Sequence, residues 1–215
     1  MTSHLVAASL MAASLTACVP TRDGACPYPD EETLRHILPV TLDPGSGTAI
    51  RVEGRYITAH HVVAGEDTVI VNGYTVDRSV WPEFEALADD WAEMLPKPTQ
   101  SGLTWLRTPV ETEKVYVAGY PGTYGLVVTE GRVQGMWDGL RLMVANAMAG
   151  NSGGAALVCR GDEYRVLGLV TTIGAQPATI PIGVGGQMVF AASTNYIVFA
   201  IPAERIYSRV AGLED

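Results

Sequence analysis

Residues 149–154 read Ala149-Gly150-Asn151-Ser152-Gly153-Gly154, a serine enclosed by glycines. Glycine permits backbone angles that place consecutive N–H groups on one side of a tight turn. Such N–H groups can hold the oxyanion that develops when a serine hydroxyl attacks a carbonyl. Gly, Asn and Ser are also ordinary turn residues, so these six residues predict either an exposed nucleophile or a hairpin loop. An upstream histidine and a carboxylate would favour the nucleophile.

The composition is that of a folded, acidic chain. Its 215 residues are 47% hydrophobic and 17% charged, which suits one large domain or two lobes and excludes overall disorder. The formal net charge of −9 argues against nucleic acid as a partner, because nucleic-acid binding needs a basic surface. The histidines and cysteines form no HExxH or CxxC motif, so we expect no metal site.

The N-terminus is typical of an exported protein. Residues 5–15 read LVAASLMAASL, an apolar run too short for a membrane span, which leads into Leu15-Thr16-Ala17-Cys18. We interpret residues 1–18 as an export signal, although residues 1–4 lack Lys and Arg; a buried or frayed helix is the alternative. The ending also resembles a bacterial lipoprotein signal, which implies lipidation of Cys18 and attachment to a membrane. We therefore expect a periplasmic, extracellular or lipid-anchored protein.

Cysteine content fits export. If Cys18 is removed or lipidated, Cys26 and Cys159 remain as a candidate disulfide, which an oxidising compartment would sustain. Two free buried cysteines are the alternative.

Beyond the signal, the chain alternates short apolar runs with turns. Residues 19–39 are predicted to be a Pro-rich linker and a short helix, which begins near Asp30 and ends before Pro39. Short strands rich in Val, Thr and Tyr then follow at the spacing of an all-β sandwich or barrel. They are predicted at residues 48–52, 55–58, 68–71, 103–108, 114–118, 125–129, 132–136, 140–144, 155–159, 165–172 and 196–200. Residues 202–210 are predicted to form a terminal helix.

Two adjacent histidines, His60 and His61, end a predicted strand upstream of the serine. A neutral imidazole is the side chain best suited to take a proton from serine near pH 7. If this segment is extended, adjacent side chains point to opposite sides, so only one of the two histidines would face Ser152.

Thr58-Ala59-His60-His61-Val62-Val63 and Gly150–Gly154 together resemble the trypsin-like serine proteases of chymotrypsin fold, most closely the HtrA/Deg-type branch. The resemblance continues in residues 117–122, 129–133 and 199–202 and covers about residues 40–210. It implies two six-stranded antiparallel β-barrels with the active site in the cleft between them. The first lobe is expected over residues 40–110, and the second, with the C-terminal helix, over residues 111–215. No stretch is left for a PDZ module, so we expect a member without one.

The resemblance also implies a catalytic triad. Ser152 is the nucleophile, and His61, fourth in its motif, is the base. Asp90 fits the acid, because it begins Asp-Trp-Ala-Glu-Met-Leu roughly thirty residues after His61. Asp89 is the immediate competitor for this role, and Asp67 and Asp77 are remote ones. Residues 82–95 also fit an amphipathic helix.

Oxyanion and substrate sites follow from the same resemblance. The N–H groups of Gly150 and Ser152 would hold the oxyanion. Asn146, Thr171, Thr172 and Ile173 would line the pocket for the residue before the scissile bond. Because no Asp stands at 146, we expect no strong preference for Arg or Lys here but an uncharged substrate residue of small to medium size.

These features predict a serine endopeptidase that hydrolyses polypeptides through an acyl-enzyme, without a metal or an organic cofactor. The alternative is a catalytically inactive trypsin-like domain that binds proteins. An α/β-hydrolase esterase shares the Gly-x-Ser-x-Gly pattern, but its histidine follows its serine in the chain, and no histidine follows Ser152.

Overall fold

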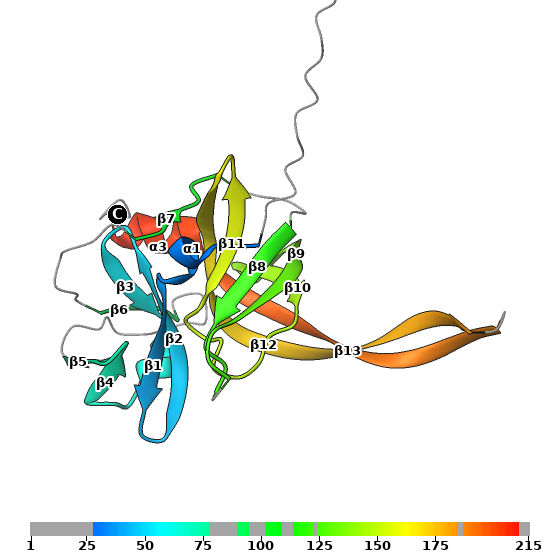
Figure 1. The fold of residues 1–215 in the computed structure, drawn as a ribbon, viewed down its shortest axis with the longest axis horizontal. Coiled ribbons are helices and arrows are strands. Elements are labelled where there is room, and N and C mark those ends of the chain that lie inside the picture. The colour runs from blue at the N-terminus through cyan, green and yellow to red at the C-terminus, as the bar shows by residue number, and fades with distance from the viewer. Residues whose placement is uncertain are drawn as a thin grey trace, which may run out of the picture.

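In a computed structural model of the chain, two β-sheets lie side by side and a long hairpin extends from the second (Figure 1). The structure describes residues 28–77, 90–94, 102–108, 114–122, 124–184 and 187–210. Helices in these ranges are short: α1 (Glu31–Leu34), α2 (His60–Val63) and α3 (Ala203–Val210). The predicted all-β fold, with a short helix near each end, is confirmed.

The first sheet has six strands in the order β5-β4-β1-β2-β3-β6, and all its pairings are antiparallel. Their bounds are Ile37–Leu42 (β1), Gly45–Val52 (β2), Arg55–Thr58 (β3), Thr68–Val71 (β4), Tyr74–Asp77 (β5) and Ala92–Met94 (β6). In β4 exposed and buried residues alternate, as expected of a strand with one covered face. The register of β3 with β6 sets Thr58 opposite Ala92. This pairing brings the chain just before β6 next to α2.

The second sheet has the order β11-β8-β9-β10-β13-β12-β7, and β11 also pairs with β12. Its six antiparallel strands therefore close into a barrel. Their bounds are Lys114–Gly119 (β8), Val127–Trp137 (β9), Leu140–Ala145 (β10), Ala155–Arg160 (β11), Glu163–Val184 (β12) and Gln187–Pro202 (β13). The additional strand β7 (Thr104–Trp105) pairs with β12 in parallel.

One apolar cluster joins the two sheets. It combines buried side chains of the first sheet, such as Ile50 and Ile57, with Tyr116, Leu157 and Leu169 of the second. Burial of apolar surface stabilises a protein by about 25 cal/mol per Å², which favours this contact. The shared core therefore fixes the two sheets relative to each other.

The N-terminal helix is shorter than predicted. The Asp30 carboxylate caps α1 by accepting a hydrogen bond from Thr33 N–H at 2.8 Å, but the helix ends at Leu34. Pro39 lies inside β1, where it faces Thr48. Ile37 and Val40 are each 1% exposed, so burial in the sheet outweighs the helical pattern of residues 35–38.

Several strand predictions differ from the structure; those over residues 165–172 and 196–200, for example, extend to Glu163–Val184 and Gln187–Pro202. Residues 125–129 and 132–136 were predicted as two strands, but β9 is continuous from Val127 to Trp137. A Cβ on Gly131 would lie 2.5 Å from Val144 O, so this glycine marks a close approach of two strands, not a turn. The strand expected over 103–108 is reduced to β7 and joins the second sheet, because Leu106 N–H donates to Val166 O at 2.8 Å. The lobe boundary at residue 110 stays a prediction, since residues 109–113 lie outside the described ranges.

His36 gives the fold a pH dependence. Its Nδ1 accepts hydrogen bonds from Arg51 Nε at 3.1 Å and Nη2 at 2.8 Å, and the residue is 6% exposed. Burial, and then the Arg51 guanidinium, lowers the pKa of His36 below its usual 6.5. The unfolded chain therefore takes up a proton more readily than the folded one. We expect the free energy of unfolding to fall as pH drops below about 6.5.

Urea unfolding at a series of pH values tests this expectation. His36→Asn keeps an oxygen acceptor for Arg51 without a titrating ring, so the variant should lose less stability than the wild type between pH 7 and pH 5. Equal losses in both proteins would exclude His36 as the cause.

Candidate active site

The turn at Gly150–Gly154 is held by main-chain hydrogen bonds to β12. Gly153 N–H donates to Val170 O at 2.7 Å, and Val170 N–H donates to Gly154 O at 2.8 Å. Gly150 and Gly153 have φ of +99° and +82°, which glycine adopts without strain. Ser152, between them, is partly exposed. The local sequence therefore forms a rigid turn that presents a serine.

Thr48 of the first sheet holds this turn, and Thr58 in turn holds Thr48. Thr48 N–H donates to Ser152 O at 2.9 Å, and Thr48 Oγ1 donates to Gly150 O at 2.8 Å. Tyr120 N–H donates to the same Oγ1 at 2.8 Å, and Thr58 Oγ1 donates to Thr48 O at 2.6 Å. The nucleophile turn of one sheet thus rests on β2 and β3 of the other.

Gly153 is required by this close contact. A Cβ at this position would overlap Thr48 O and Thr58 Oγ1, and its positive φ is unfavourable for alanine as well. We expect Gly153→Ala to lower the free energy of unfolding by several kcal/mol, since backbone strain alone costs about 1–3 kcal/mol.

Gly161→Ala is the matched control, because Gly161 also has a positive φ, of +64°, but a Cβ added there would have nothing within 4 Å. It should cost only about 1 kcal/mol. Urea midpoints of the two variants measure the difference, and equal midpoints would show that the contact with Thr48 is unimportant.

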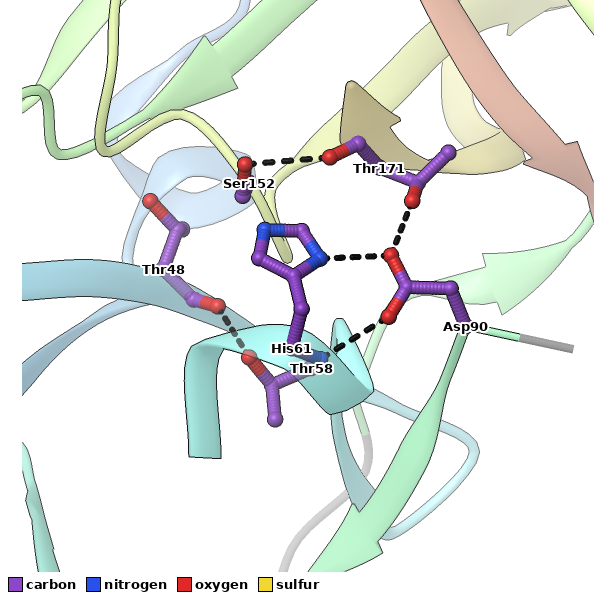
Figure 2. A network of polar contacts seen from close by, with 6 residues as sticks. All are labelled: Thr48, Thr58, His61, Asp90, Ser152 and Thr171. Atoms are coloured by element: carbon purple, nitrogen blue, oxygen red, sulfur yellow. Dashed lines mark hydrogen bonds and ion pairs between the residues drawn. The ribbon is translucent and has the colours of Figure 1, made fainter. Parts of the chain in front are cut away.

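His61 and Asp90 form the second part of the site. His61 N–H donates to Asp90 Oδ1 at 2.8 Å, and His61 Nδ1 lies 2.6 Å from Asp90 Oδ2 (Figure 2). Thr171 Oγ1 donates a further hydrogen bond to Asp90 Oδ2. Asp90 is 1% exposed, so these donors satisfy a buried carboxylate, as such groups require. The other ring nitrogen of His61 is left available for a proton.

The local conformation at the histidines differs from the prediction. Residues His60–Val63 form the helical turn α2 and not an extended segment, so the expectation of alternating side chains was wrong. It is nevertheless His61 that contacts Asp90. Residues 92–94 form β6, which contradicts a helix there; residues 82–89, and with them Asp89, lie outside the described ranges.

Ser152 is connected to the same network through Thr171. Its Oγ donates to Thr171 O at 3.1 Å, and the Thr171 hydroxyl reaches Asp90 (Figure 2). No hydrogen bond joins Ser152 to His61 among the described residues. Catalytic hydrogen bonds are often long or misaligned in free enzymes and tighten when substrate binds. Proton transfer to His61 would require the serine hydroxyl to turn away from Thr171 O.

The main chain of the turn carries two available donors. Within the described ranges, neither Gly150 N–H nor Ser152 N–H donates a hydrogen bond to the protein. A Cβ on Gly150 would lie 2.6 Å from Gly122 N and 2.8 Å from Tyr120 O, so glycine keeps the backbone in place here. Donors of this kind are suited to an oxyanion.

The residues predicted to line the substrate pocket differ in their exposure to solvent. Thr171 is buried, Thr172 and Ile173 are half-buried, and Asn146 is exposed. The Thr171 hydroxyl is engaged with Asp90, a contact not predicted from the sequence. The assignment of the substrate pocket remains a prediction.

Comparison with known families agrees with this geometry. The trypsin-like peptidase domain family matches residues 45–169, which is more than half of the chain and includes His61, Asp90 and Ser152. The chain belongs to this family. The chymotrypsin-type resemblance drawn from the sequence is thereby confirmed, and family membership implies polypeptide substrates for this peptidase domain.

Solved structures share the fold of the peptidase domain. The Rv3671c protease from M. tuberculosis in its active form has a TM-score of 0.59 at 21% identity, covering 83% of this chain and 81% of that one. The serine endoprotease from Yersinia pestis has a TM-score of 0.59 at 21% sequence identity, and the match covers 85% of this chain and 64% of that one. The serine protease of a human pathogenic astrovirus has a TM-score of 0.54 at 20% sequence identity, and the match covers 78% of this chain and 88% of that one. Among curated proteins, no relative matches the chain.

The cysteines and the N-terminus add two findings. Cys159 is disulfide-bonded, whereas Cys18 and Cys26 lie outside the described ranges, so the Cys26–Cys159 pairing stays a prediction. None of the helices in the described part of the peptidase domain has the length and hydropathy needed to cross a membrane.

Proposed function

We propose that the chain is a serine endopeptidase in which Ser152 is the nucleophile, His61 the general base and Asp90 the acid that orients His61. The observation that carries this proposal is the double contact of Asp90 with His61, through the main-chain N–H and through Nδ1. It fixes the ring so that Nε2 is the nitrogen left to accept a proton.

The reaction follows from the positions of these groups. Ser152 Oγ attacks the peptide carbonyl carbon as its proton passes to His61 Nε2, and the N–H groups of Gly150 and Ser152 stabilise the oxyanion. The C–N bond then breaks, and His61 returns the proton to the leaving amine. Water, activated by His61, hydrolyses the resulting ester on Ser152 and completes the cycle. Each oxyanion donor contributes about 3 kcal/mol to lowering the barrier.

A fluorophosphonate probe tests the proposal, because it reacts only with an activated serine. The folded wild type should be labelled at pH 8 on the peptide that contains Ser152, and Ser152→Ala should not be labelled. The competing hypothesis is a catalytically inactive binding domain, which the contact of Ser152 Oγ with Thr171 O would suit. That hypothesis predicts no labelling of either protein.

Export is part of the proposal. The apolar residues 5–15 and the Leu-Thr-Ala-Cys sequence support a signal that ends at Cys18, with lipidation of this cysteine. Cell fractionation should find the protein outside the cytosol, and Cys18→Ala should release it from membranes. Recovery of the wild type in the cytosol would contradict this part of the proposal.

A further inference from the structure

The β12–β13 hairpin extends beyond the strands that flank it in the barrel. Strand β10 pairs with β13 no further than Ile197, and β11 pairs with β12 no further than Leu169. From there to Val184 and Gln187, β12 and β13 pair with no other described strand, and Figure 1 shows them leaving the barrel as a long hairpin. A two-stranded hairpin alone is marginally stable in water, and a third strand is needed to stabilise it. The hairpin is therefore suited to receive a further strand.

Two prolines protect the outer edge of β12. In antiparallel strands, residues alternate between pairs that hydrogen-bond to each other and pairs whose N–H and C=O groups point away. Pro177 and Pro181, which face Thr194 and Phe190, have no N–H and so belong to the outward-pointing pairs. A strand added beside β12 would meet two positions without a donor. Proline on an edge strand is one of the devices that prevent such pairing.

The outer edge of β13 has no such protection. Because the register is regular from Thr172 to Val184, Met188 and Ala192 also belong to outward-pointing pairs, as do Phe190 and Thr194. None of these four residues is proline, and no described strand pairs with them on this side. Strand β13 therefore offers an unbroken row of main-chain donors and acceptors.

We propose that β13 pairs with β13 of a second copy of this chain, antiparallel, about a two-fold axis at Ala191. This axis sets Met188 of one copy opposite Thr194 of the other, and Phe190 opposite Ala192. Outward-pointing residues then face each other throughout, and each pair exchanges two hydrogen bonds, about eight in all. This inference is independent of the proposed catalytic function.

Pairing through β13 gives a closed dimer. The two hairpins form one sheet of four strands, in the order β12-β13-β13-β12. Both outer strands of this sheet are β12, whose edge carries Pro177 and Pro181. The two-fold axis uses up both β13 edges, so no third copy can be added in the same way.

The charge pattern favours a second copy as the occupant of this edge. With a net charge of −9, two copies repel each other, and they can meet only where their surfaces lack charge. No Asp, Glu, Lys, Arg or His occurs between Arg165 and Glu204, a stretch that includes the whole hairpin. Ile197, where β10 ends its pairing, stands six residues from Ala191. The two barrels are thus held about 40 Å apart, well beyond the Debye length of about 8 Å at physiological salt.

Cross-linking tests which strands meet. Ala191→Cys places a thiol at the proposed axis, so a short bismaleimide should link two full-length chains into a dimer. Ile180→Cys is the matched control, because Ile180 faces Ala191 within the hairpin. In the dimer its thiols would lie three strand spacings apart, about 14 Å, which the reagent is too short to span. The wild type measures linkage through the native cysteines. Equal linkage in the two variants, or linkage of Ala191→Cys no greater than the wild-type level, would overturn the inference.

A pair of proline variants tests the hydrogen bonds. Ala192→Pro removes an outward N–H from β13, and Thr179→Pro removes the outward N–H of the residue that faces it on β12. Ala192→Pro eliminates two hydrogen bonds of the dimer, so we expect its dimer Kd to rise about tenfold or more. Thr179→Pro should keep the wild-type Kd. Sedimentation equilibrium measures both values, and circular dichroism checks that both variants are folded.

The two proline variants share the same N-terminus, so association through that segment would affect both equally. Equal Kd values for the two variants would place the contact away from β13 and contradict the proposal. A wild type that sediments as a monomer would reject the dimer, and continued growth beyond two copies would reject the closed pairing. Neither result bears on Ser152, whose fluorophosphonate labelling tests the proposed catalytic function separately.

Discussion

Replacing Ser152 by alanine should lower kcat on a peptide substrate by on the order of 10⁶-fold, because no other hydroxyl in the network can take over the attack. Among the residues that the structure describes, Ser152 makes one side-chain hydrogen bond, to Thr171 O, so its loss should leave the fold intact. Initial rates under saturating substrate, with circular dichroism of both proteins, measure the effect.

The matched control is Ser46→Ala, a serine of β2 that faces Thr41 and lies outside the network. It should retain wild-type kcat. If Ser152→Ala keeps more than about a hundredth of the wild-type rate, the nucleophile is not Ser152, because the oxyanion donors and substrate binding alone supply only about 10³–10⁴-fold over water.

Asp90→Asn should lower kcat by about 10⁴-fold. The carboxylate accepts hydrogen bonds from His61 N–H, His61 Nδ1 and Thr171 Oγ1. An amide has only one oxygen, so its NH₂ group would face one of these donors. If it faces Nδ1, His61 must adopt the other tautomer, which places the proton on Nε2, the nitrogen that must act as base. Rates at saturating substrate measure this loss.

Two further variants make the assignment of the acid specific. Asp89→Asn tests the neighbour in sequence, and Asp67→Asn tests an exposed aspartate in the bend just before β4. Both should keep wild-type kcat. A large loss in Asp89→Asn, with Asp90→Asn active, would reverse the assignment. Urea unfolding of Asp90→Asn shows whether a lost rate reflects lost structure.

The local features of the site could be predicted from the sequence. Glycines at 150 and 153 predicted a tight turn, and the structure gives both a positive φ. The same turn depends on Thr48, which lies 102 residues before Gly150 and has no signal of its own in the sequence. The contact of Thr171 with Asp90 is also remote in sequence, because Thr171 lies 81 positions after Asp90. Contacts between distant segments depend on how the two sheets meet, which local patterns do not determine.

Strands were predicted where their own residues determined them. β3 and β4 have the predicted bounds, because each is a short Val-, Ile- or Thr-containing run between turns. β6 was missed because three residues next to an amphipathic pattern become a strand only by pairing with β3. The hairpin beyond Thr172 was missed because prolines such as Pro177 and Pro181 are unfavourable in a strand. They are tolerated here only because they stand at positions where a backbone N–H would point away from β13.

The most direct test of Ser152 as the nucleophile is the mass of the intact protein after mixing with an ester substrate and quenching in acid. An acyl-enzyme on Ser152 predicts an added mass equal to the acyl group, found on the proteolytic fragment that contains residues 149–154 and absent from Ser152→Ala. Substrate turnover without this adduct, or an adduct on another residue, would contradict Ser152 as the nucleophile.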